Sequence, residues 1–194
     1  IECYKNPQII RISKLYGYNS PSDKPTVVKR IVTALDLQQP ISLDNERVRY
    51  FTCTEDVASL VVKVLHEGCD SKKIWQLNGE EGMTEYQLGL FVAKSYAKVF
   101  YPDSEQENAL QHLQSLIRVE EKQTRIDDRP LASRPGTIRL VNDISHTSLE
   151  ERLAELVPQI SLRTKWHRLA DWFCEQIFNY VKTKEEYQYE IDNI

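Results

Sequence analysis

The sequence predicts an α/β fold, and three observations support this prediction. Short apolar runs alternate with amphipathic helical runs over about the first 100 of the 194 residues. Prolines, glycines and polar clusters separate these runs, as turns and loops require. The length suffices for one domain with a hydrophobic core, or for one domain and a smaller lobe.

Composition and charge disfavour some classes of partner and indicate a cellular compartment. The 25 basic and 29 acidic side chains leave a net charge of −4, which disfavours nucleic acid because phosphate backbones select clustered Lys and Arg. No apolar run approaches the roughly 20 residues that cross a bilayer, so no membrane partner is predicted. The four cysteines are scattered and form no CxxC pair, which indicates reduced thiols in the cytoplasm and no metal site.

The first predicted strands and helix follow from the spacing of apolar residues and from the prolines that precede them. Residues 8–13, after Pro7, are rich in isoleucine and predict one buried strand. Residues 26–36 place apolar side chains at helical spacing after Pro25, and residues 41–43 form a short strand candidate. These buried helix positions are Val27, Val28, Ile31, Val32 and Leu35.

The stretch "VRYFTCTEDVASLVVKVL" predicts a strand that leads directly into a helix. Thr54 is the expected N-cap, and Glu55 and Asp56 lie in the first turn, where the helix dipole favours acids. Residues 73–78 form the next strand candidate. Thr84 and Gln87 then form a capping box at the start of a helix. The apolar positions expected to be buried on these two helices are Val57, Leu60, Val61, Val64, Leu65, Leu88, Phe91, Val92 and Tyr96.

The remainder of the chain is predicted to be mostly helical. Residues 103–123 form a polar amphipathic helix, and residues 124–136 an irregular loop with two Arg-Pro steps. A capping box of Thr147 and Glu150 opens a short helix, and a second helix follows over residues 163–182. The charged residues 184–194 are expected to fray. The second helix carries Trp166, Leu169, Phe173, Ile177 and Val181 on one side.

Several catalytic motifs are missing from the sequence. None of the six glycines belongs to a GxGxxG or GxxxxGK[ST] phosphate-binding loop, and no HExxH or GxSxG motif occurs. Tyr180 and Lys184 match the YxxxK spacing at which a lysine lowers the pKa of a tyrosine general acid. This pair ends the last predicted helix, so we interpret it as a solvated helix end.

Arg49 has two competing interpretations. Its strand leads into a helix, which would place its side chain near the carboxyl edge of a sheet, where α/β folds bind ligands. The planar guanidinium suits a diphosphate because it pairs with two oxygens. The alternative is a structural ion pair with one of the nearby carboxylates.

The segments "IIRISKLYG", "RYFTCTEDVASLVVKVL", "WQLNGEEGMTEYQLGLFVAKSY" and "RPLASRPGTIRL" together resemble the extended short-chain dehydrogenase/reductases. They are most similar to the dTDP-4-dehydrorhamnose reductase branch, which includes the NADP-binding regulatory beta subunit of methionine adenosyltransferase. The resemblance implies the C-terminal part of a Rossmann-type fold over residues 1–100. It further implies a helical insertion over 101–128, a mostly helical substrate-binding lobe over 129–183 and a charged tail over 184–194.

The resemblance also implies site residues and a cofactor. The chain would begin after the glycine-rich turn and the catalytic YxxxK, so NADP would bind only with a missing N-terminal half. Two departures weaken the match, since Phe51-Thr52 replaces a proline-threonine step and Cys53 replaces a histidine. No catalytic residue is predicted in this chain. The implied contacts are Arg11 and Ser13 for the cofactor, and Lys14, Tyr16, Arg49, Thr52, Arg129 and Arg134 for the substrate.

Three hypotheses for function remain open. The chain is the substrate-binding portion of an NAD(P)-dependent reductase of nucleotide-linked 4-keto sugars, with an N-terminal Rossmann half as its partner. Alternatively it is a non-catalytic regulatory or scaffold subunit within a hetero-oligomer, like the methionine adenosyltransferase beta subunit. A third hypothesis is a remnant held inside a larger assembly, which would expose apolar strand faces when isolated.

Overall fold

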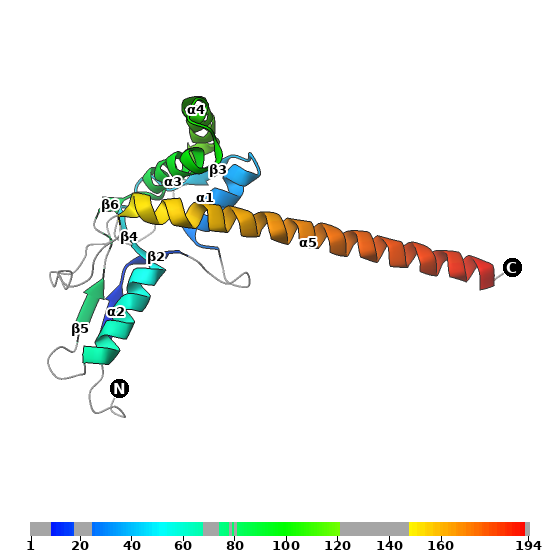
Figure 1. Ribbon diagram of the computed structural model, residues 1–194, viewed down its shortest axis with the longest axis horizontal. Coiled ribbons are helices and arrows are strands. Elements are labelled where there is room, and N and C mark those ends of the chain that lie inside the picture. Colours follow the sequence, from blue (N-terminus) through cyan, green and yellow to red (C-terminus); the bar gives the residue numbers. More distant parts are fainter. Residues whose placement is uncertain are drawn as a thin grey trace.

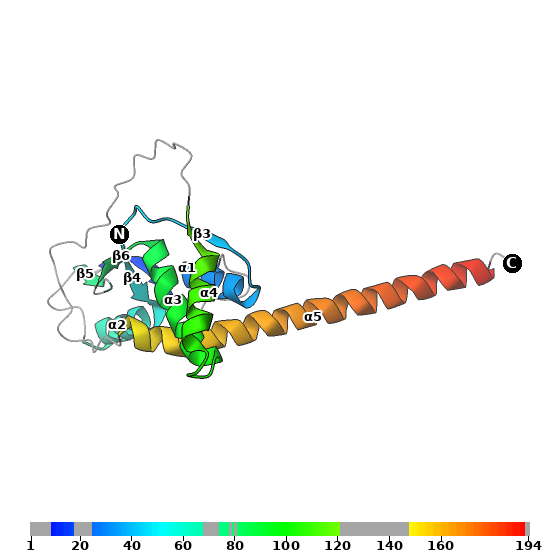
Figure 2. The same cartoon turned by 90° about the horizontal axis from the view of Figure 1, so that it is seen from above.

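The computed structural model describes residues 9–17, 25–67, 74–77, 79, 81–120 and 148–192. Short strands and helices form a body, from which the C-terminal half of one long helix extends (Figures 1 and 2). The helices are α1 (Val27–Asp36), α2 (Thr54–Glu67), α3 (Glu85–Phe100), α4 (Gln106–Leu116) and α5 (Leu149–Asp192). The strands are β1 (Ile9–Ile12), β2 (Lys14–Tyr16), β3 (Ile41–Leu43), β4 (Arg49–Cys53), β5 (Ile74–Leu77), β6 (Gly82–Met83) and β7 (Ile117–Val119).

The described strands form three small sheets. β1 pairs in parallel with β5, and β3 with β7. β4 lies between β2, which is parallel to it, and β6, which is antiparallel. The fold is thus mixed α/β, as the sequence predicts.

The single strand predicted over residues 8–13 is wrong. The chain forms two strands, β1 and β2, which meet at Ser13 and belong to different sheets. The Ser13 amide donates to the carbonyl of Leu77 at 3.3 Å, whereas its hydroxyl donates to the carbonyl of Tyr50. Ser13 therefore links β5 to β4 at the point where the chain crosses from one sheet to the other.

Two predicted helices are confirmed, and one of them has its predicted cap. Thr26 caps α1 by accepting from the Lys29 amide at 3.3 Å. Thr84 and Gln87 form the predicted capping box of α3, with hydrogen bonds of 2.8 and 3.1 Å. All five predicted apolar positions of α1 are buried. These signals are local, which explains why the sequence contained them.

The helix predicted over residues 103–123 is too long. α4 ends at Leu116, and the next three residues form β7, which pairs with β3. The pairing is extended when the Glu120 amide donates to the carbonyl of Leu43 at 2.9 Å. Ile117 is buried at the start of β7, so this segment packs into the core.

The two C-terminal helices predicted by the sequence are one helix. α5 continues from Leu149 to Asp192, through Pro158 and into the segment expected to fray. Pro158 leaves the carbonyl of Ala154 without its intrahelical donor, but Ala154 is exposed and water can bond there. The capping box is formed by Ser148 and Glu151, one residue later than predicted. Among the described helices, none is apolar enough over a sufficient length to cross a bilayer.

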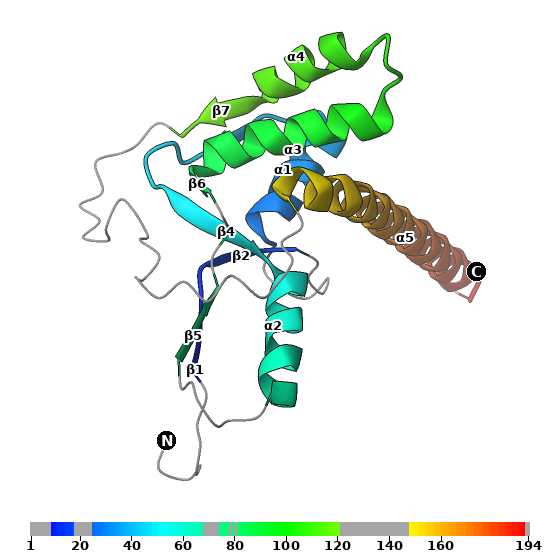
Figure 3. The same ribbon diagram turned by 60° about the vertical axis from the view of Figure 1, so that its left-hand side comes forward.

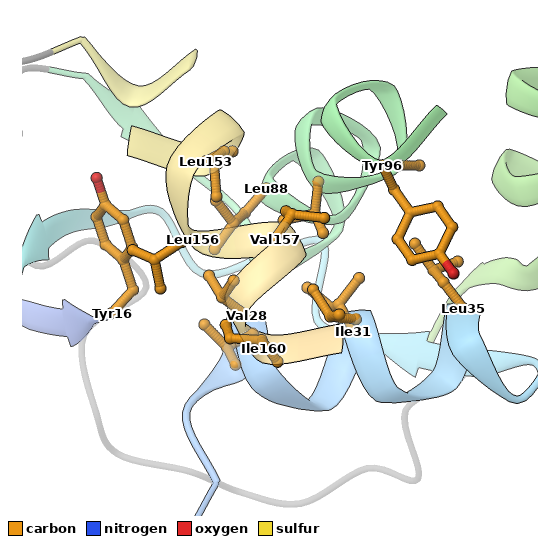
Figure 4. Packing of buried hydrophobic residues seen from close by; sticks show 14 of the residues in the cluster. Tyr16, Val28, Ile31, Leu35, Leu88, Tyr96, Leu153, Leu156, Val157 and Ile160 are labelled. Atoms are coloured by element: carbon orange, nitrogen blue, oxygen red, sulfur yellow. The ribbon is translucent and has the colours of Figure 1, made fainter. Parts of the chain in front are cut away.

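The main core lies between α1, α3 and the first turns of α5 (Figure 4). Its centre contains fully buried aliphatic side chains from all three helices, among them Ile31, Leu88 and Val157. Gly89 of α3 lets β3 approach closely, since a Cβ there would lie 2.7 Å from Leu43 Cδ1. Close packing of this kind supplies most of the stability of small domains.

A buried carboxylate joins the same three helices. Asp36, the last residue of α1, has a side chain that is 1% exposed. Its Oδ1 accepts hydrogen bonds of 2.7 Å from the Tyr96 hydroxyl of α3 and the Ser161 hydroxyl of α5. Lys165 Nζ lies 3.9 Å from the same oxygen. Burial and the bond to Asp36 raise the pKa of Tyr96, so its hydroxyl stays protonated and donates.

A second, smaller core lies between α2 and the β1–β5 pair (Figure 3). Leu60 and Val64 of α2 are buried there as predicted, whereas Val61 and Leu65 are exposed, Leu65 by 76%. Ile9 and Ile12 of β1 are also exposed, although the sequence predicts a buried strand. Only one face of this layer is covered by the described residues.

Replacing Asp36 with Ala should destabilise the fold. The change leaves the buried hydroxyls of Tyr96 and Ser161 without an acceptor, and we expect a loss of about 3 kcal/mol. Urea unfolding followed by circular dichroism measures this loss. The matched control is Asp103→Ala on an exposed loop, which should change the free energy of unfolding by less than about 0.5 kcal/mol. Equal effects of the two substitutions would show that the buried hydrogen bonds of Asp36 do not stabilise the fold.

Candidate functional site

The parallel pair of β2 and β4 brings two of the predicted site residues, Ser13 and Thr52, into contact. Lys14 lies opposite Phe51, and Tyr16 lies opposite Cys53. The hydroxyls of Ser13 and Thr52 are 2.5 Å apart, and Thr52 is buried. The structure thus brings Ser13 and Thr52 together across 39 positions of sequence, whereas Tyr16 and Thr52 lie on opposite faces of the strand pair.

Charged side chains gather where these strands end. We define the carboxyl-end cluster as Tyr16, Cys53, Glu55, Asp56 and Arg152. Arg152 Nη2 of α5 donates to Asp56 Oδ1 at 2.8 Å, and Arg152 Nη1 lies 3.5 Å from Glu55 Oε2. The Cys53 thiol donates to Glu55 Oε2 at 3.1 Å. One guanidinium thus holds two carboxylates at the start of α2.

The turn after β2 has room only for glycine. Gly17 has φ +140°, in the region that favours glycine, and a Cβ there would lie 2.0 Å from Thr54 Oγ1. Gly17 therefore lets the end of β2 approach the first residue of α2. This close approach positions Tyr16 beside the carboxyl-end cluster.

The electrostatics of the cluster keep its neutral groups protonated. Burial, followed by the charges of Cys53 and Asp56, raises the pKa of Tyr16. Burial and the hydrogen bond to Glu55 raise the pKa of Cys53 to about 11. Burial opposes the charge of Arg152, but the hydrogen bond to Asp56 outweighs it and raises the pKa of Arg152. At neutral pH the phenol and thiol are therefore donors, and neither is poised as a general base.

Arg49 does not lie at the carboxyl edge, so that prediction of its position is wrong. It is the first residue of β4, about 13 Å along the strand from Cys53. Its register partner is Met83 of β6, and its Nε lies 3.8 Å from Glu85 Oε1 at the start of α3. The distance fits an ion pair, but the buried Nε has no hydrogen-bond partner in the part of the chain that the structure describes. The structural ion pair weighed from the sequence is present, in an incomplete form.

The other predicted site residues are dispersed. Arg11 is exposed on β1, opposite Gln76, and Lys14 is exposed at the start of β2. Tyr16 is only 3% exposed and Thr52 is buried, so neither presents much surface to a ligand. Arg129 and Arg134 lie outside the described residues.

Sequence reasoning missed Arg152. It is the sole basic residue among positions 148–162, and it follows Glu150 and Glu151 on α5. A single arginine in the acidic first turns of a helix is a sequence pattern that could have indicated an ion pair. Its partner Asp56 is 96 positions away, and no local pattern identifies such a pair.

The residues present fit a nicotinamide cofactor poorly. Ser13 donates its proton to the Tyr50 carbonyl, so its hydroxyl has no proton left for a cofactor oxygen. Arg11 is exposed and available for a phosphate, but the sequence has no glycine-rich loop for a pyrophosphate. Among the described residues, no group of three or more His, Cys, Asp or Glu side chains is arranged for a metal ion.

Comparison with known proteins shows a similarity of fold. No protein-family model and no curated protein sequence matches the chain. The structure is similar to dTDP-4-dehydrorhamnose reductase from Bacillus anthracis, solved with NADP, with a TM-score of 0.55 and 16% identity. That similarity covers 81% of this chain and 50% of the reductase.

Two further structures give the same result. UDP-N-acetylglucosamine 4-epimerase from Bacillus cereus has a TM-score of 0.52 and 15% identity, over 80% of this chain and 47% of the epimerase. dTDP-glucose 4,6-dehydratase from Bacillus anthracis, solved with NAD, has a TM-score of 0.52 and 16% identity, over 81% and 45%. The chain spans about half the length of these structures. At these identities the predicted resemblance to nucleotide-sugar enzymes is confirmed for the fold alone.

Replacing Arg152 with Ala should weaken the attachment of α5 to α2. The change leaves Asp56 in a site that is largely buried, and we expect a loss of about 2 to 3 kcal/mol in the free energy of unfolding. Denaturant unfolding measures the loss. Glu155→Ala is the control, since Glu155 also contacts Arg152 but is well exposed, and it should cost less than about 0.5 kcal/mol. A neutral Arg152→Ala would contradict a structural role for the cluster.

The thiol of Cys53 should resist alkylation. Its pKa of about 11 leaves roughly one thiolate in a thousand at pH 8, and the side chain is buried. We expect iodoacetamide to modify exposed Cys174 at least about 100-fold faster than Cys53 in the folded protein. Peptide mapping by mass spectrometry resolves the two sites, and the rate at Cys53 should rise as the pH approaches 11. Rapid labelling of Cys53 at pH 8 would contradict the burial and the pKa.

Proposed function

We propose that this chain is the substrate-binding part of an NAD(P)-dependent reductase-like protein that acts on a nucleotide-linked 4-keto sugar. The observation that carries the proposal is the similarity of fold to dTDP-4-dehydrorhamnose reductase over 81% of the chain. The proposal includes an N-terminal Rossmann half, in the same protein or on a partner subunit, because the sequence has no glycine-rich loop. That half would supply the catalytic Tyr–Lys pair and most contacts to NADP, in the cytoplasm.

Arg49 is the proposed ligand of the nucleotide diphosphate. Its side chain is 26% exposed, its buried Nε has no hydrogen-bond partner among the described residues, and Glu85 Oε1 is 3.8 Å away. A diphosphate would satisfy the planar fork with two oxygens, which one distant carboxylate oxygen does not. Glu85 would hold the side chain in place until the anion arrives.

Lys14 strengthens this assignment. It lies opposite Phe51, which is two residues after Arg49, so the Cα atoms of Lys14 and Arg49 are diagonal neighbours about 8 Å apart. Paired residues of adjacent strands share one face of the sheet, as do residues two apart along a strand. Two cations on one face favour an anionic ligand over a neutral sugar alone.

Replacing Arg49 with Ala should weaken the binding of nucleotide sugars. With the full-length protein, isothermal titration calorimetry of dTDP-glucose and UDP-N-acetylglucosamine should show a loss of at least about tenfold in affinity, because one charged hydrogen-bonding group is lost. Arg30→Ala, on the exposed face of α1, is the matched control and should bind like the wild type. Unchanged binding by Arg49→Ala would remove Arg49 from the site.

A regulatory or scaffold subunit, as in the methionine adenosyltransferase beta subunit, is the second candidate. It is favoured by the segment "NGEEGMTEYQ", residues 78–87, which resembles that relative. A stopped assay of NADPH absorbance with full-length protein and a dTDP-4-keto sugar separates the two. Oxidation of NADPH supports the reductase, whereas sugar binding without oxidation supports the regulatory subunit.

A further inference from the structure

The part of α5 beyond the body carries an exposed apolar surface. We define the distal stripe as Leu162, Trp166, Leu169, Phe173 and Ile177, whose spacing of three and four residues places them on one helix face. All five are exposed, from 43% at Leu169 to 63% at Trp166. Trp172 lies beside the stripe, with its ring 5.0 Å from that of Phe173. Isolated exposed apolar residues are ordinary, but a contiguous surface of this size indicates an interaction.

The described residues of the body do not cover the distal stripe. The first turns of α5 bury Leu153, Leu156, Val157 and Ile160 against α1 and α3. Because each residue turns the helix by about 100°, Leu162 points away from Ile160 by about 160°. The apolar face of α5 therefore changes sides between these two residues, and the helix then leaves the body (Figure 1).

The distal stripe is complementary to itself in the antiparallel direction. When two copies of α5 are aligned about the midpoint between residues 169 and 170, Leu162 lies opposite Ile177 of the other copy. Trp166 then lies opposite Phe173, and Leu169 opposite Ala170. Each large side chain meets an apolar one, and the small Ala170 lets the helices approach at the centre.

The charged side chains at the centre of this segment lie outside the distal stripe. At about 100° per residue, Arg168, Asp171 and Glu175 point roughly 140–160° away from the centre of the stripe. Two copies can therefore bring their stripes together without burying these three charges.

The area and the surroundings permit such a pair. Three half-exposed aromatic rings of about 150–250 Å² each and three aliphatic chains offer about 500 Å² per copy, which brings a pair near the roughly 1,000 Å² of a specific interface. The tip of the partner helix would pass along the side of α5 that carries Glu151, Glu155 and Gln159. These three residues are exposed, so the body does not block its path.

We propose that α5 pairs with α5 of a second copy of this chain, antiparallel and centred between Leu169 and Ala170. The full-length protein should then be a dimer by sedimentation equilibrium at micromolar concentrations. Trp166→Glu combined with Phe173→Glu should weaken dimerisation at least about 100-fold, because the aromatic pairs are lost at both ends of the interface. Val62→Glu, which charges an exposed apolar residue of α2, is the matched control and should leave the dimer unchanged.

Disulfide crosslinking tests the direction of the helices and does not depend on the double variant being folded. Leu162→Cys and Ile177→Cys chains, each also carrying Cys174→Ser, are mixed and oxidised, and the joined peptides are identified by mass spectrometry. A bond between positions 162 and 177 is the expected product. A bond between two copies of position 162 would indicate parallel helices and overturn the proposal, as would a wild-type monomer at 100-fold higher concentration or a dimer equally weakened by Val62→Glu.

Discussion

The buried carboxylate of Asp36 is the constraint on which the arrangement of the helices depends. It lies at the C-terminal end of α1, where the helix dipole disfavours a negative charge. Two hydroxyl donors and the ammonium of Lys165, from α3 and α5, offset this cost at Oδ1, whereas the buried Oδ2 has no hydrogen-bond partner among the described residues. The carboxylate is therefore stable there only when both helices are in place, which makes the three-helix core cooperative.

Arg152 fixes α5 at a second point. It lies nine residues before Ser161, or about 14 Å along the helix, and it contacts α2 rather than α1. The docked part of α5 thus connects the main core to the layer formed by α2, β1 and β5. This also explains the carboxylate that opens α2, because Asp56 serves a distant arginine and not Arg49, which has its own partner in Glu85.

The sequence predicted the elements whose signals are local. The apolar face of α1, the capping box of α3 and the strand before α2 all depend on neighbours within a few residues. The break at Ser13 and the strand β7 depend on partners in β4 and β3, so residue patterns alone could not reveal them. The break predicted before residue 163 reflects a real change, in which the apolar face of α5 changes sides while its backbone stays helical.

The candidate site, too, was predicted only in part from the sequence. The resemblance to nucleotide-sugar enzymes named Ser13 and Thr52, whose hydroxyls the parallel pair of β2 and β4 brings into contact. The strand-to-helix pattern placed Arg49 near the carboxyl edge, whereas Arg49 is the first residue of β4 and lies at the opposite end of the strand. Arg152 was missed because an ion pair between two distant segments leaves no mark on the local pattern of either segment.

The length of α5 has a mechanical consequence. After Lys165, its last contact with Asp36, the helix continues for about 40 Å at 1.5 Å per residue. A rotation of about 5° at the docked base would therefore move the tip by roughly 3 to 4 Å, close to the width of a methyl group. Because α5 is long, a small rotation of its docked base around Asp36 becomes a large displacement of its C-terminal end.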